Sequence, residues 1–360
     1  MRLGVALVAV FLAYASRVES FNCSGTSGTT CNGLVGYVPA NATSLSNITA
    51  LFGLQNNSFT SLLGANNFPL TTSPNQSVSA NHTLRIPFQC ACNNGSGFPV
   101  NPPVHTVVSG ESLSSIASVV FAGLVKWENI QTFNNVTNPN LILIGQKLKI
   151  PLPCSCDEVG GERVVHYGYA VESGNSVEGI AQQFNTTEAT LLALNGISSP
   201  KDLMADQPLD VPLKACTTMV GNKSLDYPLL VANGTYIFTA GNCVMCSCNA
   251  ANNWTLQCEP SQAQSTLWTT CPSLQCQGSS TESLYIGNTT TSGCNRTTCA
   301  YAGYSSKTIF TTLTTLSTCP VSTNAPAPQP SPAHILSFSL QGWSFILIFI
   351  HLVLQYLHLT

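Results

Sequence analysis

Three stretches of the chain end in nearly the same phrase, in which apolar and polar residues alternate before a proline. They read LRIPF at residues 84–88, LKIPL at 148–152 and LDVPL at 209–213. Such alternation is typical of a strand with one buried face, and a proline ends the pairing of that strand. Because the phrase recurs at a nearly fixed spacing, it indicates repeated modules that each close with a strand.

The same order of elements precedes each closing strand. Strand-like segments open the three units at residues 35–38, 105–108 and 167–171. In the middle unit, residues 112–120 and 125–133 place apolar side chains at helical spacing. Turn signals that contain asparagine end the second helix of each unit, at Asn66, Asn134 and Asn195. The pattern predicts strand, helix, helix, strand, with both helices on one face of the paired strands.

These elements predict an α+β fold of three small βααβ modules, followed by a different kind of domain. The modules are expected at residues 21–89, 104–152 and 165–214, and the first is divergent. Residues 215–320 contain ten cysteines and show no helical period, so they predict a separate Cys-rich domain of strands and loops.

Cysteines supply the cross-links that modules of this size need. All 16 lie between Cys23 and Cys319, and an even number in a secreted chain indicates a closed set of disulfides. The two thiols of each Cys-X-Cys pair, at Cys90 and Cys92 and again at Cys154 and Cys156, are expected to bond different partners and to clamp neighbouring modules. Zinc or redox chemistry at Cys243 and Cys246 is disfavoured because no histidine is near, and no metal or cofactor is predicted.

Both ends of the chain carry targeting signals. Residues 1–20 have a cation, an apolar stretch and small final residues, which predicts a signal peptide. Residues 321–333 form a Pro-rich linker with Ser322 or Asn324 as the attachment residue, and residues 335–360 are an apolar tail, so the order predicts a GPI anchor. A transmembrane helix is the alternative, but no Lys or Arg follows Lys307 to fix its orientation.

Glycosylation sites and low charge describe the surface. Only 8% of residues are charged and the net charge is -3, which excludes a nucleic-acid partner and predicts an uncharged ligand, with membrane contact through the lipid anchor alone. Fourteen Asn-X-Ser/Thr sequons predict heavy N-glycosylation of a secreted chain. They are Asn22, Asn41, Asn47, Asn56, Asn75, Asn81, Asn94, Asn135, Asn185, Asn222, Asn233, Asn253, Asn288 and Asn295.

The middle unit resembles the LysM module in three segments. These are HTVVSGESLSSIA at residues 105–117, NPNLI at 138–142 and GQKLKIP at 145–151. Three such units between a signal peptide and a GPI signal are similar to the plant LysM-domain GPI-anchored proteins, and most similar to the chitin-elicitor-binding group. The resemblance implies a shallow groove for N-acetylglucosamine oligomers, and disulfides that join Cys23 to Cys92, Cys31 to Cys156 and Cys90 to Cys154.

On this chain the implied groove lies between two loops of the middle module. Its residues are Val108, Ser109, Gly110, Glu111, Ser112, Leu113, Thr137, Asn138, Pro139, Asn140, Leu141 and Ile142. Capping of the following helix is the stronger interpretation of Glu111, and core packing is an equal alternative for Leu141 and Ile142. The middle module is favoured because the first has extra residues 39–41 and a long loop at 71–81, while the third has Asn175 where an acid is usual and Pro208 in its last strand.

The leading hypothesis is a non-enzymatic receptor component at the extracellular face of the plasma membrane that binds chitin oligomers. The expected chain has no cytoplasmic residues, so a signal needs a partner, and the resemblance implies a LysM receptor-like kinase. One oligomer could also bridge a homodimer. Bacterial peptidoglycan and lipochitooligosaccharide are alternative ligands, and a wall-tethering protein is a further alternative. A glycan hydrolase is disfavoured, because the sparse acids Asp157, Glu158 and Glu162 fit a solvated hinge better than a catalytic pair.

Overall fold

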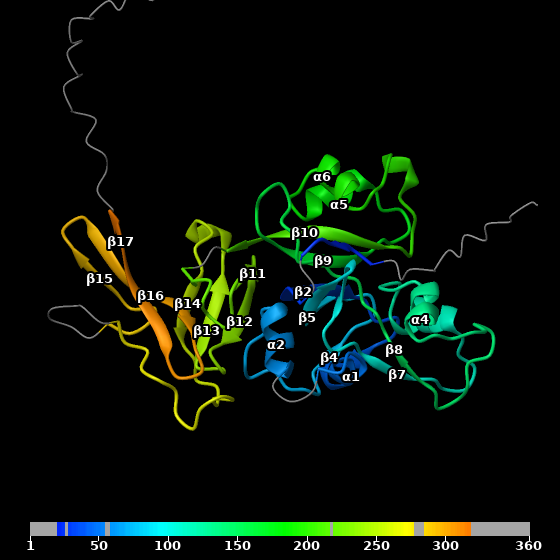
Figure 1. Ribbon diagram of the computed structural model, residues 1–360, viewed down its shortest axis with the longest axis horizontal. Coiled ribbons are helices and arrows are strands. Elements are labelled where there is room, and N and C mark those ends of the chain that lie inside the picture. Colours follow the sequence, from blue (N-terminus) through cyan, green and yellow to red (C-terminus); the bar gives the residue numbers. More distant parts are fainter. Residues whose placement is uncertain (1–19, 26–27, 55–57, 217–218, 277–283, 318–360) are drawn as a thin grey trace, which may run out of the picture. The chain divides into compact units, whose positions relative to one another are not determined.

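The computed structural model describes residues 20–25, 28–54, 58–216, 219–276 and 284–317 (Figure 1). These residues belong to one compact unit, and the residues from Thr318 onward lie outside the described part of the chain. The predicted signal peptide up to residue 19, the sequon at Asn56, and the anchor signal with Ser322 and Asn324 lie outside the described residues as well.

The predicted α+β class and the βααβ order are confirmed in all three modules. The first module consists of β2 (Thr30–Tyr37), α1 (Leu45–Leu51), α2 (Ser58–Ala65) and β5 (Leu84–Asn93). A short pair, β3 (Thr43–Ser44) with β4 (Ser77–Val78), folds its long loop back onto the start of α1. Strands β2 and β5 are longer than the predicted segments because both continue into the disulfide clamp.

The middle module has two short strands and a first helix that ends in a π-helical turn. It comprises β7 (Val104–Thr106), α3 (Leu113–Ser115), the π-helical turn Ile116–Val120, α4 (Trp127–Phe133) and β8 (Lys147–Lys149). Phe121 comes five residues after Ile116, whereas Phe184 comes four after Ile180 in the third module. The extra residue is absorbed in the π turn, where Phe121 N donates to Ile116 O at 3.0 Å.

The third module pairs its strands over their whole length. It comprises β9 (Val164–Ala170), α5 (Val177–Gln183), α6 (Glu188–Leu194), a 3₁₀ turn (Pro200–Asp202) and β10 (Pro208–Cys216). Figure 1 shows α5 and α6 on the same face of this pair. Buried Val177, Ile180 and Leu191 of the helices and Val211 of the strand form one cluster, which is the core of this module.

The first and third modules share one sheet, a feature that the sequence did not reveal. Its strand order is β1 (Asn22–Cys23), β6 (Gly95–Pro99), β5, β2, β9, β10 and β11 (Val231–Ala232). Strands β2 and β9 are parallel neighbours, with Leu34 opposite Tyr167. Gly36 permits their close approach, because a Cβ there would lie 1.9 Å from the Tyr167 hydroxyl. The middle module keeps a separate two-stranded sheet of β7 and β8.

The asparagine that ends the second helix of each module does more than stop the helix. In the middle module, Asn134 Nδ2 donates to Ile130 O and to Lys149 O, both at 2.8 Å, and its Oδ1 accepts from Lys149 N at 2.8 Å. Asn66 makes the same set of bonds with Arg85, and Asn195 with Asp210. One side chain therefore fastens each second helix to the closing strand.

Replacing Asn134 by alanine is expected to lower the free energy of unfolding by about 2 kcal/mol, since three hydrogen bonds to the backbone are lost at a half-buried site. Chemical denaturation of the glycosylated protein measures the change. Asn134→Asp keeps the acceptor for Lys149 N but loses both donors, so we expect an intermediate loss. An Asn134→Ala protein as stable as the wild type would contradict this role.

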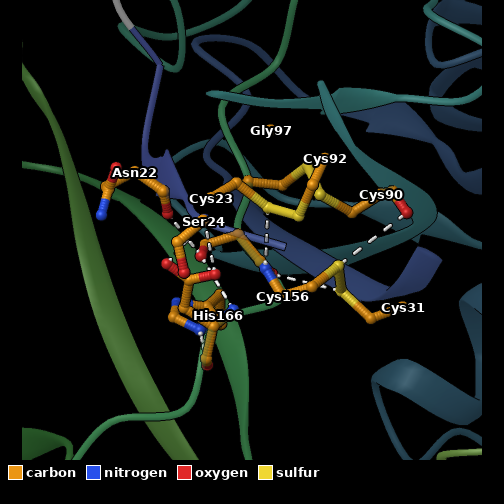
Figure 2. Close-up of a disulfide and its surroundings, with 12 residues drawn as sticks. Asn22, Cys23, Ser24, Cys31, Cys90, Cys92, Gly97, Cys156 and His166 are labelled. Carbon is orange, nitrogen blue, oxygen red and sulfur yellow. Dashed lines mark hydrogen bonds between the residues drawn. A yellow bond between two sulfur atoms is a disulfide. The ribbon is translucent and has the colours of Figure 1, made fainter. Parts of the chain in front are cut away.

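Three disulfides tie the strand ends of the first module to the linkers (Figure 2). They join Cys23 to Cys92, Cys31 to Cys156 and Cys90 to Cys154, which are the pairs that the family resemblance implies. Hydrogen bonds support this clamp, because buried Ser155 donates from Oγ to Asn22 O at 2.6 Å and the Asp157 carboxylate accepts from Ser24 N at 2.7 and 2.9 Å.

The Cys-rich region consists of strands and loops, as predicted. Sheet β12 (Thr235–Thr239), β13 (Val244–Cys248) and β14 (Gln257–Pro260) is followed by sheet β15 (Thr289–Ser292), β16 (Asn295–Tyr304) and β17 (Ile309–Ser317). The bridges between its described residues are Cys216–Cys248, Cys243–Cys271, Cys246–Cys258 and Cys276–Cys299. Since Cys243 and Cys246 both form structural bridges to other cysteines, the disfavoured zinc and redox interpretations have no free thiols to use.

The expected separation of this region from the modules is wrong in one respect. Strand β10 of the third module pairs directly with β11, so the sheet continues across the predicted boundary at residue 215. Buried Tyr236 of β12 joins the core of the first two modules, and its hydroxyl donates to Phe68 O at 2.7 Å. The contact is close, since a Cβ on Gly64 of α2 would lie 2.1 Å from Tyr236 O. Within the described residues, the Cys-rich region is packed onto the first module.

Candidate glycan-binding site

Two loops of the middle module leave its small sheet from adjacent positions. The first connects β7 to α3, and the second connects α4 to β8. Beyond the β7 and β8 ladder, Val107 N donates to Gln146 O at 2.9 Å and Gly145 N donates to Val107 O at 2.8 Å. These bonds hold the start of the predicted segment 108–113 beside the end of the loop that contains residues 137–142.

Glu111 stabilises the first loop but does not cap the following helix. Its Oε2 accepts from Val108 N at 2.8 Å and lies 2.8 Å from His105 Nε2, so the carboxylate closes the turn internally. The helix cap is Ser112, whose hydroxyl accepts from Ser115 N while Ser115 Oγ accepts from Ser112 N. The interpretation of Glu111 as a helix cap is therefore wrong, and its charge is engaged within the protein.

The third module closes the equivalent turn with a neutral side chain. Asn175 Oδ1 accepts from Glu172 N at 3.0 Å and from the Tyr169 hydroxyl at 2.6 Å, while Ser176 caps α5. Asn175 thus holds its turn in the same way as Glu111 holds the middle one. This substitution is no reason to prefer the middle module.

The structure divides the predicted residues of the first loop into a surface set and a core residue. Val108 is 55% exposed, and Ser109, Gly110 and Ser112 are exposed as well. Leu113 is only 1% exposed and packs in the core of the first two modules, so its assignment to the ligand site is corrected. Its place at the first position of α3, just after the helix cap, turns the side chain inward.

The second loop presents apolar side chains to solvent. Leu141 is 69% exposed, whereas Ile142 packs against the core. Of the two alternatives for this pair, core packing therefore applies to Ile142, and Leu141 remains available for a ligand. Leu143 and Ile144, at 71% and 73%, are exposed next to Leu141 and were not predicted. The sequence signal was available, since the run LILI at residues 141–144 cannot bury every side chain in a tight loop. Trp127 packs against the core.

Both loops also offer unused backbone donors. The N–H groups of Ser109, Gly110 and Ile142 have no hydrogen-bond partner within the described part of the chain. Thr137, Asn138 and Asn140 add exposed polar side chains, and Pro139 between them is half-buried. Donors beside exposed apolar groups suit an uncharged ligand that carries amides and methyl groups.

The first module fills the corresponding position with its own loop. At the start of α1, Leu45 N donates to Gln76 O at 3.1 Å and Ser46 N donates to Pro74 O at 2.7 Å. The equivalent N–H groups of Leu113 and Ser114 in the middle module have no such partner among the described residues. The long loop that raised doubt about the first module therefore occupies the place that a ligand would need.

A cavity of about 470 Å³, lined by both polar and apolar groups, lies elsewhere, between the first module and the Cys-rich region. Leu34, Phe88 and Phe238 are among its lining residues, and none of the residues of the two middle-module loops takes part. A shallow surface made by two loops need not form an enclosed pocket, so the loop geometry and not this cavity defines the candidate site.

Thirteen of the fourteen sequon asparagines fall within the described residues, and all thirteen are exposed. Five occupy left-handed turns, at Asn81, Asn94, Asn135, Asn185 and Asn253. Exposure meets the requirement for glycan attachment, and glycosylation of these sites stays a prediction.

Comparison with known proteins identifies the modules. The sequence model of the LysM domain family matches residues 105–151 and 169–212, which are the middle and third modules. The loops described above therefore belong to a LysM domain.

Two relatives extend this match over most of the chain. LysM domain-containing GPI-anchored protein 2 of Arabidopsis thaliana is 47% identical over 301 residues, which are 83% of this chain and 83% of that protein. Chitin elicitor-binding protein of Oryza sativa subsp. japonica is 38% identical over 337 residues, 93% and 90% of the two chains. The chain belongs to the family of LysM domain-containing GPI-anchored proteins. The localisation predicted from its two ends agrees with the name of this family.

Among solved structures, the ectodomain of a receptor like kinase is similar over 52% of this chain and 94% of its own, with 18% identity and a TM-score of 0.43. Within the described residues, no helix has the length and apolar character to cross a membrane.

Proposed function

We propose that the middle module binds chitin oligomers through its two loops, and that the protein acts as a receptor component in innate immunity. The observation that carries the proposal is the pairing of exposed Val108 and Leu141 with the unused N–H groups of Ser109, Gly110 and Ile142. Apolar side chains can cover N-acetyl methyl groups while the N–H groups donate to acetamido carbonyls. The name of the rice relative, chitin elicitor-binding protein, supports chitin as the ligand.

Calorimetric titration of the secreted protein with chitin oligomers tests this ligand. Peptidoglycan fragments and lipochitooligosaccharide are compared in parallel, because both contain N-acetylglucosamine. An oligomer of glucosamine without acetyl groups is the essential control, since it keeps the sugar rings but removes the proposed recognition groups. Equal affinity for acetylated and non-acetylated oligomers would contradict the proposal.

Leu141→Ala is expected to weaken chitin binding about tenfold, because the loss of a contact worth roughly 1.4 kcal/mol changes the dissociation constant by that factor. Leu141 is 69% exposed in the free protein, so stability should not change. Met204→Ala is the matched control, since Met204 is 63% exposed on the corresponding loop of the third module. A loss of affinity from Met204→Ala alone would assign the site to the third module. Ile142 is unsuitable for this test because it packs against the core.

A second protein is needed to carry the signal if the chain ends in the outer leaflet. We propose a LysM receptor-like kinase as this partner, and we propose that one chitin oligomer joins two copies of this chain as a homodimer. The kinase should co-precipitate with the wild-type protein when chitin oligomer is added, and Leu141→Ala should remove this gain at unchanged surface level. Chitin-induced kinase phosphorylation that is normal in cells without this protein would contradict the partnership.

A further inference from the structure

Strand β17 forms a long open edge at the end of the Cys-rich region (Figure 1). It spans nine residues and is the last strand in the order β15, β16, β17. Among the described residues, its backbone is paired with β16 alone, and no backbone hydrogen bond leaves its other edge. An open edge of this length presents a row of N–H and C=O groups that can pair with another strand.

The other edges in the described part of the chain are short or covered. Strands β1 and β11 have two residues each, β14 and β15 have four each, and β12 is covered by α2 where Gly64 meets Tyr236. Strand β17 itself contains no charged residue, proline or glycine that would block further pairing, since its sequence is IFTTLTTLS. The bulge of this sheet lies in β16 between Tyr301 and Gly303, and the Thr311 hydroxyl donates to Gln275 O at 3.2 Å. The nearby sequons lie on neighbouring segments, with Asn288 before β15 and Asn295 at the start of β16, opposite Ser317 at the end of β17.

The strand is also complementary to itself. Read outward from Leu313, its residues match on both sides: Thr312 with Thr314, Thr311 with Thr315, and Phe310 with Leu316. Antiparallel pairing about Leu313 would place the members of each pair opposite one another and on the same face of the sheet. Phe310 and Leu316, which are 38% and 69% exposed, would become apolar neighbours, and no like charges would meet.

We propose that β17 pairs with β17 of a second copy of this chain, in antiparallel register about Leu313. The contact is isologous and closes after two copies, as expected of a two-fold dimer. Anchoring in one membrane would favour it, because copies confined to a plane meet at a higher effective concentration. This dimer needs no glycan, which distinguishes it from a dimer that an oligomer bridges.

Cysteine cross-linking without glycan tests both the pairing and its register. Phe310→Cys and Leu316→Cys are made in separate full-length chains with different tags and expressed on the same cells. The proposed register puts the two thiols opposite each other, within reach of a disulfide. We expect a cross-linked dimer that contains both tags on a non-reducing gel.

Each variant expressed alone is the matched control. Two Leu316→Cys chains would hold their thiols six residues apart along the strand, about 20 Å, which is too far for a disulfide. Thr314→Lys in both chains should abolish the cross-link, since it brings two lysines diagonally together across the pair. No cross-link in the mixed population at normal surface levels, or equal cross-linking of Leu316→Cys with itself, would overturn the proposal.

Discussion

Removing two of the three clamp disulfides is expected to lower the free energy of unfolding by about 7 kcal/mol, although removing any one should cost only about 3 kcal/mol. The variants replace Cys31 and Cys156 by serine, alone and together with Cys90 and Cys154. Denaturant unfolding of the glycosylated proteins, with the other bridges left oxidised, measures both losses. If the three bridges acted independently, the first step would instead cost about 5 kcal/mol and the second about 4 kcal/mol, because separations of 125 and 64 residues would set the entropy.

The unequal losses follow from the way the bridges are connected. Cys31 and Cys156 are 125 residues apart, but the other two bridges already join them by a path of eight residues from Cys31 to Cys23 and two short Cys-X-Cys segments. Each bridge therefore closes a loop of only about a dozen residues while the other two remain, so little denatured-state entropy depends on it. Once Cys31–Cys156 is gone, removing Cys90–Cys154 opens a loop with a separation of 64 residues, which costs over 4 kcal/mol.

The Cys246–Cys258 bridge provides a control within the same chain. Its separation is 12 residues, close to the effective loop of the clamp, so its removal should cost about as much as removal of Cys31–Cys156. If the full separation of 125 residues set the entropy instead, the clamp bridge would cost about 2 kcal/mol more than this control. A difference of this size would show that the path through the other two bridges is not the reason for the small loss of stability when one clamp bridge is removed.

Local patterns were enough to predict the modules. The strand phrases at 84–88 and 209–213 lie within β5 and β10, and the phrase at 148–152 begins in β8, which ends at Lys149. The turn and cap residues lie where the helices begin and end. These features depend on residues close together in the chain, so alternation and capping carry the information. Prediction of the exact strand lengths failed at β2 and β5, because the clamp that extends them joins distant residues.

Features that depend on packing between modules could not be predicted from such patterns. The parallel contact of β2 with β9 rests on Gly36, whose missing side chain is uninformative without its neighbour Tyr167. The burial of Asp210 could not be predicted from the local pattern either. Its equivalents Arg85 and Lys149 are partly or fully exposed, as the alternation predicts, whereas Asp210 is 1% exposed.

The candidate site was predicted in outline and not in detail. The two loops were located correctly on their elements, because the turn residues and the resemblance agree on them. Solvent exposure then separated Leu113, which is buried, from Leu141, Leu143 and Ile144, which are exposed. The run at 141–144 indicated that some of these apolar side chains must be exposed, but sequence alone could not tell which of them face solvent. Binding by these loops stays a proposal until ligand affinities are measured.

Replacing His166 by alanine is expected to lower the free energy of unfolding by about 3 to 5 kcal/mol, because it would leave the Asp210 carboxylate buried without its partner. His166 and Asp210 are each 1% exposed, and Nδ1 lies 2.9 Å from both carboxylate oxygens. Nε2 donates to Asp157 O at 2.8 Å, which connects the third module to the clamp (Figure 2). His105→Ala is the control, since its partner Glu111 is 15% exposed and can be hydrated, so we expect a loss of about 1 kcal/mol.

The same pair should make stability depend on pH. Burial opposes protonation of His166, but the hydrogen bond and charge of Asp210 and the Asp157 carbonyl outweigh it and raise the pKa of His166 above 6.5. Burial also raises the pKa of Asp210, against the effect of His166, so both groups favour retention of the proton they share. An unfolded histidine loses its proton near pH 6.5, and the folded pair loses it at higher pH. The stability from this proton is therefore complete below pH 6.5 and declines as pH rises through the folded pKa of His166. The free energies of unfolding of the wild type and of His166→Ala are measured from about pH 5 to 9, and the difference between them should become smaller toward alkaline pH. A difference that stays constant over this range would show that the pair holds no extra proton.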